Sequence, residues 1–260
     1  MKKVGKYLLI ALLLLIALCL VGVLYLFFIP GSNLFGITYI SYNTTITTEN
    51  SYLYTDVNKV ILKSNAYNVQ VSLTDNDKIF ATVYSNSLGF THINNSVPSI
   101  NASFATNTLE IKVNEPSGLT LKNDSLITLY LPKAYNSALE FENNAATTTL
   151  DKEDLKISGL TYTTNSGNLN LNSGTFLGSL KVNINNATCT IAENVVLDEA
   201  KNDVTLTIAN GKFDAPTKDF GQFNISSNVR GVVIINSCNN LVQKNNTTAG
   251  GRIEIAHLNS

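Results

Sequence analysis

Residues 160–171, LTYTTNSGNLNL, hold the pattern that decides the fold of this chain. Leu160 and Tyr162 are two positions apart, so they lie on the same face of an extended strand. The sequence NSG at 165–167 is typical of a turn, because Asn and Gly tolerate positive φ. The apolar alternation then restarts at Leu169. The stretch therefore predicts two short strands joined by a tight turn.

The same phrase recurs about six times between Leu139 and His257, at steps of 21, 20, 24, 19 and 19 residues. A single unit of this size cannot bury its apolar face, whereas stacked units share one core and pair strand on strand. We therefore predict an all-β fold in which residues 136–260 form a β-solenoid of about 20 residues per turn. An antiparallel sandwich, which has short strands at about 8–12-residue spacing, is the alternative. The first apolar positions of the six units are Leu139, Leu160, Leu180, Val204, Phe223 and Val242.

An asparagine stands five residues after the first position in four of these units. The four are Asn144, Asn165, Asn185 and Asn228. Stacking of the units would align them into an asparagine ladder along one corner. The preference of Asn for turns explains the same pattern without a ladder.

Residues 56–135 also alternate, but less regularly, and we expect them to form an N-terminal β region. Alternating runs cover 60–73, 79–84, 109–113 and 126–130. The pattern fades between Asn86 and Phe104, which predicts a long loop there. A solenoid needs an end cap that shields the unpaired edge of its first turn, and this region is the candidate for that cap.

The N-terminus is expected to anchor the chain in the cell membrane. Residues 1–6 are basic and form a short cytoplasmic tail, and residues 7–29 are a run of 23 residues without a charge. At about 1.5 Å per residue this run reaches about 35 Å, enough to cross roughly 30 Å of hydrocarbon. The lysines before it favour a cytoplasmic N-terminus and an extracellular C-terminal domain. Residues 30–55 are polar and read as a juxtamembrane spacer with a strand at 35–40. A cleaved signal peptide is the alternative, but no clear small-residue cleavage site follows the run.

Composition argues against a nucleic-acid partner. Charged residues make up only 14% of the chain, below the usual quarter. After the first 30 residues there are 15 basic and 19 acidic residues, whereas nucleic-acid binding needs a basic face.

Three cysteines do not indicate a metal site, because they lack any CxxC spacing. Cys19 lies in the apolar N-terminal run. Cys189 occupies a position that is apolar in the other units, so we interpret it as a small core residue. A disulfide between Cys189 and Cys238 is a second interpretation, which would require a core residue to meet a corner residue.

The chain resembles a bacterial family described as the putative adhesin domain of unknown function. The resemblance lies in the alternating pair VILKSNAYNVQVSL (60–73), the strand ITLYLPK (127–133) that ends in Pro-Lys, and units such as LTYTTNSGNLNLNSG (160–174). It covers about residues 57–257. The Ser-Gly turn of the family is matched at 166–167, whereas Ala187 and the pair 145–146 stand where Gly is expected. The resemblance implies a membrane-anchored β-solenoid of the cell envelope, and it supplies no catalytic residue.

The sequence contains no recognisable catalytic motif, and we expect no catalytic, cofactor-binding or metal-binding residues. His92 and His257 stand alone, and no P-loop, dinucleotide fingerprint, G-x-S-x-G or H-E-x-x-H occurs. Glycoside hydrolysis needs two carboxyl groups about 5–9.5 Å apart. Two acidic clusters were therefore considered, and solvated turns are the simpler interpretation of both. They are Asp75 with Asp77, and Asp151 with Glu153 and Asp154.

Three functional hypotheses follow. The first is an extracellular, adhesin-like protein that binds a glycan or a surface protein, or has a structural role, and is not an enzyme. The second is a carbohydrate-active enzyme on a β-helix, suggested by the acidic clusters. The third is an accessory sensor of envelope stress, in which small residues such as Gly22 let the helix pack against membrane partners.

Overall fold

The computed structural model describes residues 2–28, 33–34, 37–92, 98–115, 118–197, 204–227, 230–244 and 251–258. It is an α-helix followed by β-strands, as predicted for an all-β protein with an N-terminal apolar segment. The chain separates into two compact units. The first contains residues 1–44, 85–98 and 116–124, and the second contains residues 45–84, 99–115 and 125–260.

The first unit contains the helix α1 (Lys2–Phe28) and a small antiparallel arrangement of strands. Residues Gly5–Tyr25 of the helix have a mean hydropathy of 3.1 and are not buried by the rest of the protein. By length and composition this segment qualifies as a membrane span or a signal anchor. The strands are β1 (Asn33–Leu34), most of β2 (Ile37–Thr47), the second half of β6 (Lys78–His92) and β9 (Gly118–Asn123).

The first region of the second unit contains several strands and a 3-10 turn, and two of the strands, at residues 59–64 and 68–74, pair with later ones. These elements are β3 (Tyr52–Leu53), a 3-10 turn (Tyr54–Asp56), β4 (Lys59–Ser64), β5 (Asn68–Thr74), β7 (Ser99–Ala105), β8 (Thr108–Asn114) and β10 (Leu126–Pro132). Two expectations for this part of the sequence were wrong. Residues 86–92 and 99–104 lie in β6 and β7, where a long loop was predicted, and residues 93–97 lie outside the described ones. The strand predicted at 35–40 is described from Ile37 as β2 and continues to Thr47, into residues expected to be a polar spacer. Pairing across sheet edges imposed extended structure on stretches whose own alternation is weak.

The later strands are short and recur in groups. They are β11 (Ala138–Asn143), β12 (Thr148–Leu150), β13 (Lys156–Ile157), β14 (Gly159–Thr164), β15 (Leu169–Leu171), β16 (Gly174–Phe176), β17 (Leu180–Ile184), β18 (Thr188–Ile191), β19 (Val195–Leu197), β20 (Val204–Ile208), β21 (Lys212–Ser227), β22 (Val232–Lys244) and β23 (Arg252–Leu258).

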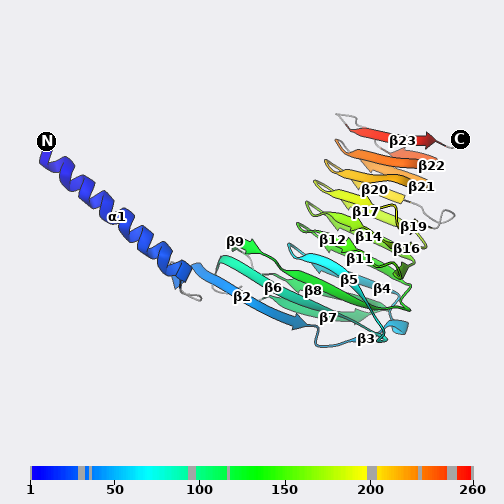
Figure 1. Ribbon diagram of the computed structural model, residues 1–260, viewed down its shortest axis with the longest axis horizontal. Helices are drawn as coiled ribbons and strands as arrows, with labels where there is room; N and C mark the ends of the chain where they lie inside the picture. The colour runs from blue at the N-terminus through cyan, green and yellow to red at the C-terminus, as the bar shows by residue number, and fades with distance from the viewer. Residues whose placement is uncertain are drawn as a thin grey trace. The chain divides into compact units, whose positions relative to one another are not determined.

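Equivalent strands pair in parallel and form three columns (Figure 1). The first column runs β8, β4, β11, β14, β17, β20, and then the second halves of β21 and β22. The second runs β10, β5, β12, β15, β18, and then the first halves of β21 and β22 and finally β23. A third, short column of β13, β16 and β19 was not anticipated from the sequence.

The predicted register holds along the first column with one exception. Leu139, Leu160, Leu180, Val204 and Phe223 are successive partners in adjacent strands. The partner of Phe223 is Leu241, however, and Val242 faces Asn224. Both residues are apolar, so the sequence did not distinguish them, and a shift of one residue moves a side chain to the other face of the strand.

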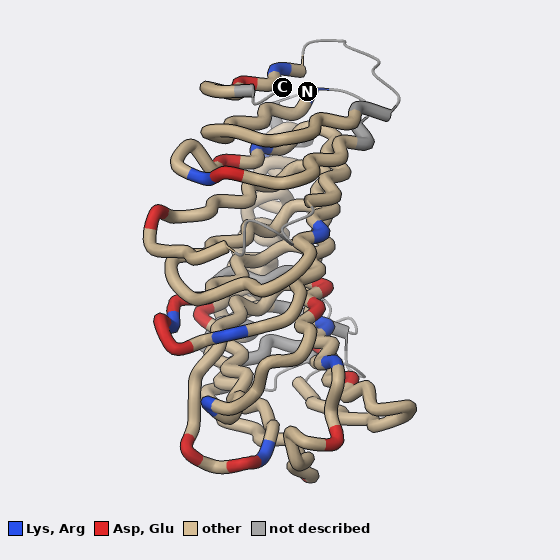
Figure 2. The backbone as a smooth tube through the Cα atoms, turned by 90° about the vertical axis from the view of Figure 1, so that its right-hand side faces the viewer, with Lys and Arg blue, Asp and Glu red and all other residues tan. Residues whose placement is uncertain are grey.

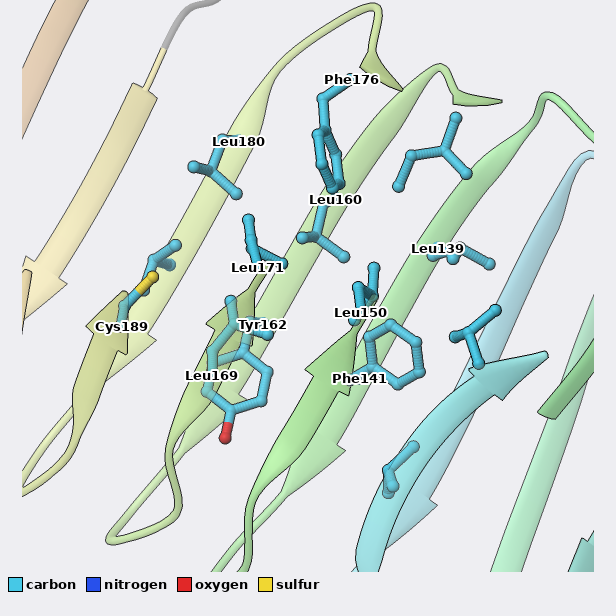
Figure 3. Packing of buried hydrophobic residues seen from close by; sticks show 14 of the residues in the cluster. Leu139, Phe141, Leu150, Leu160, Tyr162, Leu169, Leu171, Phe176, Leu180 and Cys189 are labelled. Atoms are coloured by element: carbon cyan, nitrogen blue, oxygen red, sulfur yellow. The ribbon is translucent and has the colours of Figure 1, made fainter. Parts of the chain in front are cut away.

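A continuous apolar core fills the space between the columns. Figure 3 shows Leu139, Leu160 and Leu180 on successive strands, with Phe141 and Tyr162 beside them. All five side chains are at most 4% exposed. At about 25 cal/mol per Å² of buried apolar surface, such stacking is the main stabilising contribution to the fold.

The two later cysteines are both buried and both free, so the alternative of a disulfide was wrong. Cys189 pairs in register with Leu169 and Phe213, which confirms its interpretation as a small core residue. Burial raises the pKa of its thiol because the apolar surroundings disfavour the thiolate.

Candidate functional site

The turns after four strands of the first column each begin with an asparagine, and the residues lie one above the next because their strands pair in register. The Asn144 amide donates to Asn65 Oδ1 at 3.0 Å, and the Asn185 amide donates to Asn165 Oδ1 at 2.7 Å. The predicted ladder is therefore present as two bonded pairs, and it includes Asn65, which was not predicted. Asn228 lies outside the described residues.

The backbone of each corner turn is held by the turn before it in the column. The N–H groups of Ala145, Ser166 and Asn186 donate to the carbonyl oxygens of the preceding asparagines at 2.7 to 2.8 Å. These bonds satisfy backbone groups that would otherwise have to face solvent. The corner is thus a rigid edge that can carry side chains in fixed positions.

The first turn of the column, residues 64–67, has a carboxylate in place of a preceding turn. Glu115 Oε1 accepts hydrogen bonds from the Ser64 hydroxyl and the Asn65 N–H, both at 2.7 Å, and a longer one from the Tyr67 N–H at 3.3 Å. Its Oε2 accepts from the Ala66 N–H at 2.6 Å. Short bonds to an ionised acceptor are stronger than neutral ones, so Glu115 closes this end of the corner.

Beside this corner, outward side chains of four adjacent strands form a row. Lys112 of β8, Lys63 of β4, Glu142 of β11 and Thr163 of β14 are successive partners in the sheet. Together with the asparagine turns they line an open groove of about 600 Å³. We call these residues, with Ser64, Asn65, Val113, Asn144, Thr164 and Asn165, the corner groove.

The charges in the corner groove are unevenly paired. Lys63 Nζ lies 3.1 Å from Glu110 and 3.5 Å from Glu142. The hydrogen bond to Glu110 and the nearby carboxylates raise the pKa of Lys63, so it stays protonated. Lys112 is exposed, and it forms no ion pair with any described carboxylate. The groove therefore offers one free cation next to amide and hydroxyl groups.

The acidic clusters considered from the sequence are exposed turns. Asp75 is 88% exposed and pairs with Lys133 at 2.8 Å, in the turn between β5 and β6 that also contains Asp77. Asp151, Glu153 and Asp154 lie in the exposed turn between β12 and β13, where Asp151 accepts a hydrogen bond from Ser173 at 3.2 Å. Neither cluster belongs to the corner groove.

Of the two histidines considered from the sequence, His257 does not line the corner groove. His257 is exposed on β23, and the side chain of His92 lies outside the described ones. Among the described residues there is no group of three or more His, Cys, Asp or Glu residues arranged to hold a metal ion. Figure 2 shows that charged residues are scattered over the backbone, most of which is neutral.

Sequence reasoning missed every charged residue of the corner groove. Lys63, Lys112 and Glu142 alternate outward on their own strands, but no feature of the sequence indicates that β8 lies beside β4 and β4 beside β11. Glu115 had one signal, since it follows an alternating strand directly and precedes Pro116, so it cannot continue that strand regularly.

No family model matches the chain, and no curated protein matches it. It resembles solved structures of a putative cell adhesion protein from Clostridium sporogenes (11% identity, TM-score 0.43, covering 82% of this chain and 99% of that one) and of a putative adhesin from Bacteroides fragilis (14%, 0.42, 82% and 97%). A putative adhesin from Parabacteroides distasonis is similar at 11% identity, with a TM-score of 0.41, over 82% and 97% of the two chains. These descriptions agree with the family resemblance of the sequence, but similarity at this level does not extend to ligand or activity.

Proposed function

We propose that the chain is a membrane-anchored β-solenoid of the cell envelope that acts as an adhesin-like binding protein and not as an enzyme. Parallel, in-register pairing of units about 20 residues apart supports the solenoid. The apolar segment Gly5–Tyr25 supports the anchor, and the lysines before it favour a cytoplasmic N-terminus.

The observation that carries the binding role is the corner groove. It is open, it is about 600 Å³ in volume, and its lining presents amide, hydroxyl and ammonium groups at fixed spacing. Groups of this kind, held by a rigid scaffold, recognise polyhydroxylated ligands through several hydrogen bonds at once. The proposed ligand is therefore a glycan, and Lys112 favours one that carries carboxylate or sulfate groups.

The test is a glycan array probed with the full chain in lipid nanodiscs, followed by titration of the glycans that bind. Lys112→Gln and Thr163→Val each remove one polar contact from the groove. Each should weaken binding about 2- to 10-fold, the value of one hydrogen bond. Lys181→Gln and Thr205→Val are matched controls, because these residues lie on outward faces of β17 and β20 and do not line the groove.

Two results would contradict the proposal. If the wild-type chain binds no glycan on arrays that include acidic polysaccharides, the ligand class is wrong. If the groove variants and the control variants weaken binding equally, binding takes place elsewhere on the surface.

The anchor is tested separately by fractionation. The full chain should remain with membranes after extraction at high pH, and protease added to intact cells should degrade the β-domain. A soluble chain in the wild type, or protection from protease, would contradict the proposed topology.

A further inference from the structure

Strand β23 is the last described strand of the second column, and the described strands pair with it on one side only. It pairs in parallel with β22 over residues 252–258, and no other described strand pairs with it. The opposite end of the stack is different, because antiparallel strands pair there with the parallel columns: β7 with β8, and β6 with β10. Among the described strands, β23 is therefore the edge of the second column at this end of the stack.

The backbone of β23 presents hydrogen-bonding groups at this edge. The Arg252 N–H donates to the Gly231 carbonyl at 3.0 Å, so the polar backbone groups of Arg252 point towards the preceding unit. Successive residues of a strand point their backbone groups to opposite sides. The N–H and carbonyl groups of Ile253 and Ile255 therefore point away from β22. An edge of this kind is a template for a further strand.

The apolar core is also incompletely covered at this end. Ile253 and Ile255 pack against the core but are only partly buried. Their partners one strand inward, Val233 and Ile235, are each 2% exposed. A strand added to β23 would extend the column and cover the two isoleucines.

The charges on β23 indicate which strand fits. Arg252 and Glu254 are two residues apart and so share the outward face, where they form an ion pair of 3.0 Å with side chains 63% and 46% exposed. Charges on an edge strand normally oppose pairing. This pair is self-complementary instead, because a two-fold antiparallel pairing centred on Ile253 sets Arg252 of each copy opposite Glu254 of the other.

The register follows from the same residues. When the pairing is centred on Ile253, the two copies of Ile253 form a hydrogen-bonded pair, because their backbone groups point outward. Arg252 of one copy and Glu254 of the other then form a non-hydrogen-bonded pair, in which the side chains are close. Centring on Ile255 would set Glu254 opposite Ala256 and Arg252 opposite Leu258, and both ion pairs would be lost. Charge therefore selects the register centred on Ile253.

We propose that β23 is a homodimerisation edge, at which two copies of the chain pair antiparallel about Ile253 and join their stacks end to end. The two interchain pairs of Arg252 with Glu254 fix the register, and the isoleucines of both copies complete a shared core. The proposal does not depend on the glycan-binding role of the corner groove.

The test uses charge reversal in the full chain, measured by sedimentation equilibrium in density-matched detergent. Wild-type chain should show a monomer–dimer equilibrium. Glu254→Arg and Arg252→Glu each replace both interchain pairs by like charges and should weaken the dimer about tenfold or more. The double variant Arg252→Glu/Glu254→Arg restores opposite charges in every pair and should dimerise like the wild type.

Mixing the two single variants provides the decisive measurement. Each repels itself but complements the other, so a tagged Glu254→Arg chain should capture untagged Arg252→Glu chain and not untagged Glu254→Arg chain. Any association through α1 is the same in all variants and cancels from the comparison. A wild-type chain that is monomeric at all concentrations, or variants that all associate equally, would overturn the proposal.

Discussion

Truncation of Glu115 should open the first corner of the stack. The substitution Glu115→Ala removes the acceptor of three bonds of 2.6 to 2.7 Å, donated by the Ser64 hydroxyl and the N–H groups of Asn65 and Ala66, and of a longer bond from Tyr67. Hydrogen bonds to a charged group contribute about 1.5–3 kcal/mol each, and they are not additive. Water can reach this exposed turn and replace part of the loss, so we expect a net cost of about 2–4 kcal/mol.

Glu115→Gln separates charge from shape. The glutamine keeps one acceptor oxygen but points an NH₂ group at backbone donors, and we expect it to cost about 1.5–3 kcal/mol. Glu153→Gln is the matched control, since Glu153 lies in an exposed turn, and it should stay within about 0.5 kcal/mol of wild type.

The assay combines thermal unfolding with amide hydrogen exchange on the full chain. A loss of 1 kcal/mol lowers the midpoint by about 2–4 °C in a domain of this size. The exchange of residues 65–67 should accelerate most, because stacked units open locally from their ends. If Glu115→Ala leaves both the midpoint and the protection of these amides unchanged, the reasoning that the carboxylate replaces a missing turn is refuted.

Three further substitutions test the stack itself by urea unfolding. Leu206→Asp places an unpaired carboxylate at a fully buried position and should cost about 4 kcal/mol or more. The control Thr205→Asp changes the adjacent, exposed residue and should leave the free energy of unfolding nearly unchanged. Equal losses of stability in the two variants would show that the register is wrong. Gly167→Ala would bring Cβ to 2.1 Å from a carbonyl oxygen of the neighbouring unit and should cost about 1–3 kcal/mol or more. In the control Gly159→Ala, Cβ meets nothing closer than 3.4 Å, so this substitution should be tolerated. Comparable losses of stability for both would mean that the units do not approach so closely. Burial raises the pKa of Tyr162 from 10.0 to about 12, so the stability that depends on its neutral phenol is complete below pH 10 and is lost as the pH rises towards 12. Tyr162→Phe removes the hydrogen bond to the Asn168 carbonyl and should cost about 1 kcal/mol at pH 8, and it should reduce the loss of stability at alkaline pH. A variant whose stability depends on pH as the wild type does would contradict this.

The parts of the fold that the sequence predicted are those fixed by local periodicity. Alternation specifies which residues share a face, and a constant step between units specifies which residues become partners. Leu139, Leu160, Leu180 and Val204 therefore meet in register as predicted. The column of β13, β16 and β19 was missed because a strand of two or three residues shows too little alternation to be recognised.

The glycines of the corner turns were predicted at the correct spacing, but the reason given for them was incomplete. Gly was expected in these turns for its positive φ, and Ala187 was treated as a departure from the pattern. The structure indicates a different constraint at Gly211, where a Cβ would lie 2.2 Å from the carbonyl oxygen of Ala187. Close approach of the next unit therefore requires glycine in one unit while alanine is accommodated, 4% exposed, in the unit beside it. The sequence of a single unit cannot reveal this constraint, because the contact is made with the neighbouring unit.

The corner groove could not be predicted, because the order of its strands differs from the order of the chain. β8 follows β4 in the sequence but precedes it in the column, and β11 pairs with β4 although β5 to β10 lie between them in the chain. Lys112, Lys63 and Glu142 come together only through these two crossovers. A repeat predicts contacts between successive copies of itself, whereas this groove forms where the first copies meet strands that precede the repeat. Binding residues at such a junction follow from topology, and for that reason Lys112→Gln and Lys181→Gln, which have the same chemistry on different strands, are expected to give different results.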